Sequence, residues 1–132
     1  MKDFLRHITT GSLNEIPESV LDAFKNEFPE AINTEWYKAA DGFEAVFHDE
    51  GIEKIAIFGD QGTILILEEN LSVDSIPLAI ADLVRDMGKI MNYIRVNNKG
   101  VVTFELILRD RNWHRHLLEV SPEGVVLNKR RL

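Results

Sequence analysis

The segment IPESVLDAF, Ile16 to Phe24, decides the fold because the chain repeats it later, in weaker form, as IPLAIADLV, Ile76 to Val84. The offset between these segments is 60 residues. Two further pairs align at almost the same offset, GFEAVF with TFELIL at 61 and DQGTIL with PEGVVL at 62. Small loop insertions produce such a drift, and a repeat of this period indicates one supersecondary unit used twice. We therefore predict two tandem copies of one structural unit.

The first element of each copy is a predicted helix. Pro17 and Pro77 suit the first position of a helix. Apolar side chains then recur at helical spacing, at Val20, Leu21, Phe24 and Phe28 in the first copy and at Ile80, Leu83, Val84 and Met87 in the second. Pro29 ends the first helix, and Gly88 is the predicted end of the second.

After each helix the apolar residues alternate with a period of two, which predicts strands. The predicted strands are 33–38, 43–48, 53–58 and 63–67 in the first copy, and 93–96, 101–109, 114–120 and 125–128 in the second. The predicted fold class is therefore α+β, with two tandem α-β-β-β-β repeats forming one eight-stranded antiparallel sheet with two helices on one face. We expect one domain over 15–132, made of repeats 15–67 and 75–128, after an N-terminal extension at 1–14.

The hairpins assign the two faces of the predicted sheet. A two-residue turn at Glu50-Gly51 pairs Phe43 with Phe58 and Val46 with Ile55, so that like faces meet. In the second copy, the pairing of Phe104 with Val120 and of Leu106 with Leu118 requires a three-residue turn at 111–113. The helices should cover the face that carries the phenylalanines.

The opposite face carries a mixture of aliphatic and charged side chains. If this face is open, its aliphatic residues are either scattered surface residues or the centre of a surface for a partner or a second copy of the chain. We predict a partner-binding surface made of Glu44, Val46, His48, Ile55, Ile57, Glu105, Ile107, Arg109, Arg115 and Leu117. Trp36 and Trp113 either join this surface or are buried strand aromatics.

One set of residues in the first copy is distinctive as a group: Pro17, Phe24, Phe28, Pro29, Trp36, Phe43, Phe47, Asp60 and Gly62. With the stretches NTEWYKAADGFEAVF and IAIFGDQGTIL, this set resembles the PepSY-like proteins common in Bacteroidetes. In the second copy RDMGKIMNY replaces the aromatic-Pro helix end, and Pro122 stands at the position of the turn Asp. The resemblance covers about residues 15 to 128. It implies the two-copy fold of the β-lactamase inhibitor protein, and a binding or inhibitory module without a catalytic set.

Composition limits the classes of function. The net charge is -7, which disfavours nucleic acid as a partner because phosphate binding depends on clustered Lys and Arg. The absence of cysteine excludes disulfides, thiol catalysis and Cys-ligated zinc. No segment has the apolar length of a signal peptide or a membrane span, so the expected location is cytoplasmic. The resemblance implies the periplasm or cell envelope if a leader has been removed, because most members of that family are exported.

The leading functional prediction is a non-catalytic binding module that presents the open sheet face to a protein or peptide partner, or to itself. We expect no enzymatic activity and no cofactor. The alternative is a small metal-dependent or ligand-binding enzyme at the 110–116 hairpin end. His114 and His116 lie two residues apart on a strand, and Asp110 lies across the turn, so the three side chains should point to one side. Because no fourth ligand can be placed, we predict no metal site.

Overall fold

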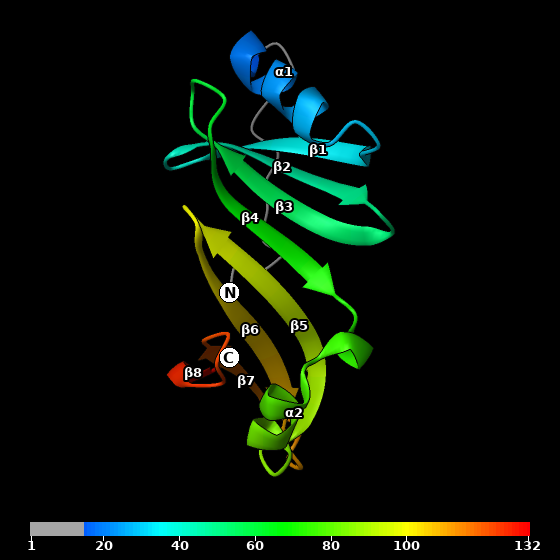
Figure 1. Ribbon diagram of the computed structural model, residues 1–132, viewed down its shortest axis with the longest axis vertical. Coiled ribbons are helices and arrows are strands. Elements are labelled where there is room, and N and C mark those ends of the chain that lie inside the picture. Colours follow the sequence, from blue (N-terminus) through cyan, green and yellow to red (C-terminus); the bar gives the residue numbers. More distant parts are fainter. Residues whose placement is uncertain (1–14) are drawn as a thin grey trace. The chain divides into compact units, whose positions relative to one another are not determined.

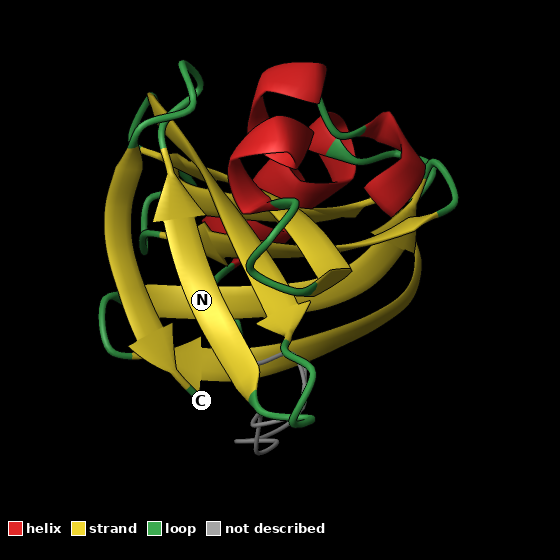
Figure 2. Ribbon diagram, turned by 90° about the horizontal axis from the view of Figure 1, so that it is seen from below, coloured by secondary structure: helices red, strands yellow, loops and turns green. Residues whose placement is uncertain are grey.

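A computed structural model describes residues 15–132 (Figure 1). By its internal contacts, the described chain divides into two compact units, residues 15–69 and residues 70–132, which are considered one at a time. Most of each unit is strand, and the helices are short (Figure 2). Within residues 15–132, no helix has the length and hydropathy needed to cross a bilayer.

The first unit consists of one helix followed by antiparallel strands. The elements are α1 (Glu18–Glu27), β1 (Ile32–Ala39), β2 (Gly42–Asp49), β3 (Ile52–Phe58) and β4 (Ile64–Leu71), the last of which runs just past the boundary. Pro17 is the N-cap of α1, and Phe28 caps its C-terminus by donating its backbone N–H to the carbonyl of Phe24. Pro29 follows and cannot continue the helix, as the sequence predicts.

The pairing of β2 with β3 follows the predicted register. Phe43 pairs with Phe58 and Val46 with Ile55. The turn between the strands is Glu50-Gly51, and both residues have positive φ, 55° and 78°. Two positive φ values are typical of the tight hairpin turn that matches the twist of the flanking strands.

An aromatic cluster joins α1 to its sheet. The ring of Phe24 lies 5.0 Å from that of Phe47 and 5.3 Å from that of Trp36, both in edge-on orientation. Phe28 lies 4.7 Å from Phe47. Aromatic rings prefer such tilted arrangements because the positive edge of one ring meets the negative face of another. Trp36 is therefore a buried strand aromatic and belongs to the core.

The β3–β4 turn packs directly against α1. Gly62 has φ of +89°, and a Cβ at this position would lie 2.7 Å from the backbone oxygen of Ser19. The hydroxyl of Ser19 donates a hydrogen bond to the backbone oxygen of Asp60 at 2.8 Å. Only glycine allows both the positive φ and this close approach, which explains why the turn sequence contains Gly62.

The second unit repeats this order. Its elements are a short 3₁₀ turn, η2 (Val73–Ser75), then α2 (Leu78–Val84), β5 (Lys89–Asn98), β6 (Val101–Arg109), β7 (Arg115–Val120) and β8 (Val126–Arg131). Strands β6 and β7 pair as predicted, with Phe104 opposite Val120 and Leu106 opposite Leu118. Leu106 and Leu118 belong to a core cluster that also contains Ile80 and Val84 of α2.

Several boundaries differ from the sequence prediction. Strand β4 continues to Leu71 instead of 67, and β8 continues to Arg131 instead of 128. Helix α2 ends at Val84 instead of continuing to Gly88, because the chain turns at 85–87 and Met87 donates its N–H to the carbonyl of Val84. Strand β5 begins at Lys89, four residues before the predicted start at Tyr93. The segment after α2 is therefore a turn and a strand, where the apolar spacing indicated helix.

Eight antiparallel strands in the order β1 to β8 and two α-helices confirm the predicted α+β fold class. The division of the chain into one domain over 15–132 after an extension at 1–14 stays a prediction, and the extension lies outside the described residues.

Candidate binding site

Most of the predicted partner surface is buried. Ile55 is 0% exposed, and Glu44, Ile57, Glu105, Ile107 and Leu117 are buried with it. The expectation of an exposed apolar centre on this face is therefore wrong. Strand β3 shows the reason, because its residues from Lys54 to Phe58 are buried consecutively, on both faces of the strand. A two-layer sheet would leave the face of β3 opposite the helices in contact with solvent, as the sequence predicted. In the structure, β3 is buried on both faces.

The remaining members of that surface are accessible. Val46 and Arg109 are half-buried, and His48 and Arg115 are exposed. Arg109 and Arg115 are directly paired across β6 and β7, at the end of the hairpin. Their role in partner binding stays a prediction.

The hairpin end is organised by the carboxylate of Asp110. Its Oδ1 accepts hydrogen bonds from the backbone N–H groups of Asn112 at 2.8 Å and His114 at 3.0 Å. Its Oδ2 lies 2.8 Å from Nε2 of His116 and 3.7 Å from Nδ1 of His114. The pKa of Asp110 is lowered to about 2, mainly by the hydrogen bond to His116; burial opposes this effect, and the backbone N–H groups of His114 and Asn112 and the nearby His114 ring lower the pKa further.

The alternative of a metal-dependent site at this hairpin depended on these same three side chains. The structure brings Asp110, His114 and His116 together, as predicted, but within residues 15–132 no group of three His, Asp or Glu residues is placed to hold a metal ion. Both oxygens of Asp110 are already engaged by the turn and by His116. The carboxylate of Asp110 therefore stabilises the turn through its hydrogen bonds.

A hollow of about 610 Å³ lies beside this hairpin, in the second unit. Three stretches of chain line it: the turn after α2, the first residue of β5, and the end of β6 with its hairpin. The lining residues are Arg85, Asp86, Met87, Gly88, Lys89, Arg109, Asp110, Arg111 and Trp113. Four of these side chains are cationic and two are anionic, so the lining carries an excess of positive charge.

The side chain of Trp113 is 72% exposed, a large fraction for an aromatic residue. Its φ is +68°, an uncommon conformation for a bulky residue. The guanidinium carbon of Arg109 lies 4.0 Å from the centroid of the Trp113 ring. The sequence predicted Arg109 as part of a partner surface and left Trp113 as either a surface residue or a buried strand aromatic; Arg85, Lys89 and Arg111 were not predicted. Their proximity depends on the turn after α2, which the apolar spacing concealed.

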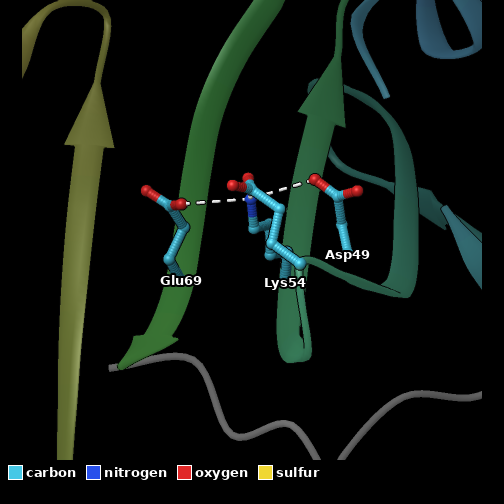
Figure 3. A network of polar contacts seen from close by, with 4 residues as sticks. Asp49, Lys54 and Glu69 are labelled. Atoms are coloured by element: carbon cyan, nitrogen blue, oxygen red, sulfur yellow. Dashed lines mark hydrogen bonds and ion pairs between the residues drawn. The ribbon is translucent and has the colours of Figure 1, made fainter. Parts of the chain in front are cut away.

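A second polar cluster, in the first unit, is structural. The ammonium of Lys54 is buried and lies 3.1 Å from Oδ2 of Asp49, 3.0 Å from Oε1 of Glu50 and 3.3 Å from Oε2 of Glu69 (Figure 3). Burial lowers the pKa of Lys54, but hydrogen bonds to the three carboxylates outweigh this effect and raise it above 10.5. The cluster joins β2, β3 and β4, and the lysine stays charged.

Comparison with known proteins identifies the fold. No protein-family model and no curated protein sequence matches the chain. Solved structures of three Bacteroides proteins are similar. One, from B. eggerthii, is named as an inferred periplasmic protein, with a TM-score of 0.79, 19% identity, and coverage of 87% of this chain and 88% of the other.

The second is a DUF2874 family protein from B. uniformis, with a TM-score of 0.78, 19% identity, and coverage of 87% and 88%. The third is a BLIP-like protein from B. fragilis, with a TM-score of 0.72, 19% identity, and coverage of 88% and 86%. At this level of identity the likeness concerns the fold alone. The chain therefore has a BLIP-like fold, named after the β-lactamase inhibitor protein, as the sequence resemblance implied.

Proposed function

We propose that the protein is a non-catalytic binding module that recognises a protein or peptide partner through the hairpin end of its second unit. We define this hairpin-end surface as Arg85, Lys89, Arg109, Arg111, Trp113 and Arg115. It keeps Arg109 and Arg115 of the sequence prediction and replaces the aliphatic residues that are buried. The observation that carries the proposal is the exposed Trp113 ring held against Arg109.

Tryptophan and arginine are the residues that most often dominate the energy of protein–protein interfaces. An exposed Trp113 leaves a large apolar area in water, which a partner can cover. Stacking on the ring also restricts the Arg109 side chain before binding, so that less side-chain entropy is lost when a partner engages it. These properties support binding, and they do not require a catalytic group.

Charge indicates the kind of partner. Residues 70–132 contain 10 basic and 7 acidic side chains, whereas residues 15–69 contain 3 basic and 14 acidic ones. A cationic hairpin end suits an acidic partner surface, because opposite potentials favour encounter and disfavour wrong partners. A second copy of the chain carries such an acidic surface in its own first unit. Self-association is therefore the second candidate.

The sequence resemblance also implies where the protein meets its partner. We propose the periplasm or the cell envelope. The support is the B. eggerthii neighbour, which has a similar fold and is described as an inferred periplasmic protein.

The test is a capture experiment with immobilised protein and with envelope and cytosolic fractions of the source organism. The variant Trp113→Ser, combined with Arg109→Ala, should lose the captured partner. The matched control is Leu78→Ser, which removes another exposed apolar side chain, on α2 of the same unit. Sedimentation of each protein alone tests self-association. Capture and sedimentation that are the same for the double variant and the wild type would refute the proposal.

A further inference from the structure

The hollow beside the hairpin end has a chemistry that specifies its ligand. We infer that it is a recognition site for the carboxylates of an acidic peptide segment, with Arg109 as the principal contact and Trp113 as the residue that orients it. This inference deepens the proposed function and rests on it.

The backbone brings the cations together. Lys89 and Arg109 are paired across β5 and β6. Gly88, just before Lys89, has φ of +149°, and a Cβ there would lie 2.6 Å from the backbone oxygen of Arg109. Glycine therefore allows the turn after α2 to approach the end of β6. This approach places Arg85 and Lys89 on the same hollow as Arg109 and Arg111.

The two anions of the lining, Asp86 and Asp110, form no ion pair with its four cations within residues 15–132. Asp110 directs its oxygens to the hairpin backbone and to His116. Arg85 is paired with Asp82, which lies outside the lining, and this pair is exposed. In the part of the chain that the structure describes, no ion pair involves Lys89, Arg109 or Arg111. Three cations therefore remain available to a ligand.

The position of Arg109 favours a carboxylate. A guanidinium stacked on an aromatic ring keeps its N–H groups in the plane of the fork, where they can donate two parallel hydrogen bonds to one carboxylate. Lys89 and Arg111 line the same hollow and add positive charge to it. Successive acidic side chains of a peptide can therefore be bound together.

The size of the hollow and the charge of the chain favour a peptide over a nucleic acid. Ligand pockets commonly have volumes of about 300–1,000 Å³, and a hollow of about 610 Å³ holds a short segment. The net charge of the chain, -7, also repels a long phosphate backbone. That repulsion disfavours extended polyanions.

The experiment is a titration of the full chain with hexaglutamate, followed by calorimetry and by tryptophan fluorescence. Trp113 is exposed and Trp36 is buried in the aromatic cluster, so the ligand should change the emission of Trp113. We expect saturable binding that weakens as salt increases and a fluorescence change that is absent in Trp113→Phe. Hexalysine should not bind.

Arg109→Ala should weaken hexaglutamate binding about tenfold or more, the loss expected when a charge-assisted hydrogen bond is removed. The control is Arg130→Ala, which removes an exposed arginine of β8 outside the hollow and should change affinity less than about twofold. Lys89→Gln should give an intermediate loss. The far-ultraviolet circular dichroism of each variant verifies folding, and if Arg109→Ala does not fold, Arg111→Gln takes its place.

The inference would be overturned by no binding of hexaglutamate, by equal binding of hexaglutamate to Arg109→Ala, or by tighter binding of hexathymidylate than of hexaglutamate. Competition by inorganic phosphate at equal concentration would also overturn it, because the site would then be a general anion site. Capture of a partner that depends on Trp113, without hexaglutamate binding, would refute this inference and leave the proposed function intact. Hexaglutamate binding by a protein whose partner capture does not depend on Trp113 would refute the proposed function alone.

Discussion

Replacement of Lys54 by methionine should destabilise the protein by about 3 kcal/mol, because breaking a buried ion pair by removing one partner leaves the other charge buried. Lys54 is 3% exposed. Its partner side chains differ in exposure, at 10% for Asp49, 13% for Glu69 and 77% for Glu50. The first two carboxylates would lose their counter-charge inside the protein, whereas Glu50 would be solvated by water.

Urea denaturation followed by circular dichroism measures this loss. Glu50→Gln should change the free energy of unfolding by less than about 1 kcal/mol, because exposed pairs contribute little. Lys129→Met, an exposed lysine in β8, is the matched control and should change it by less than about 0.5 kcal/mol. The double change Lys54→Met with Asp49→Asn should recover part of the loss, since the uncompensated carboxylate is then removed.

The raised pKa of Lys54 sets the pH range of this effect. A lysine whose pKa is raised in the folded state stabilises that state fully below the unfolded pKa, about 10.5, and the contribution disappears as pH rises through the folded pKa. The difference between the wild type and Lys54→Met should therefore be constant from about pH 6 to 9 and decrease above about pH 10.5. A loss below about 1 kcal/mol at pH 7 would refute the view that this ion cluster is a buried structural element.

The other predictions concern both cores and the hairpin. Phe24→Ala and Leu106→Ala should each reduce the free energy of unfolding by about 2–5 kcal/mol, measured in urea, because each leaves a cavity under a helix; a loss below about 0.5 kcal/mol would contradict their burial. Ile55→Lys or Ile107→Lys should lower the melting temperature strongly, since both positions are buried; an unchanged melting curve would restore the exposed face that the sequence indicated. Asp110 has a lowered pKa, so its ionised form stabilises the fold above about pH 4 and this contribution is lost as pH falls through about 2. The stability difference between the wild type and Asp110→Asn should therefore vanish near pH 2, and a difference that persists there would show that the carboxylate charge is not the cause.

Local patterns predicted the hairpins well because each register is determined by residues close in sequence. The Glu50-Gly51 turn fixes the pairing of Phe43 with Phe58, and the structure has this pairing. The end of α2 could not be predicted in the same way. Met87 continues the apolar helical spacing, but its backbone closes a turn onto Val84 instead.

The face assignments were correct, but the exposure inferred from them was wrong. Ile55 lies on the face that the pairing predicts, since its partner is Val46. Whether a face is covered depends on parts of the molecule that are remote in sequence, and an alternating pattern contains no information about them. The hollow was missed for a related reason, because its cations come from two stretches of chain, 85–89 and 109–111, that are twenty residues apart.

Comparison of the two copies explains why the hollow occurs in the second. At the repeat offset of 60, Phe28 and Pro29 correspond to Gly88 and Lys89. Phe28 fills the end of its helix-to-sheet core with a ring packed on Phe47. Gly88 has no side chain, and the space beside it is the hollow.

The difference between Pro29 in the first copy and Lys89 in the second affects the strand that follows. Proline lacks the backbone N–H that a strand needs, so Pro29 prevents β1 from starting early. Lys89 has that N–H and begins β5 opposite Arg109. The exchange of an aromatic-proline pair for glycine-lysine thus removes a core side chain, lengthens a strand and adds a cation at the same place. At this place the first copy therefore has a packed aromatic ring, and the second has a hollow lined by four cations, as the proposed recognition site requires.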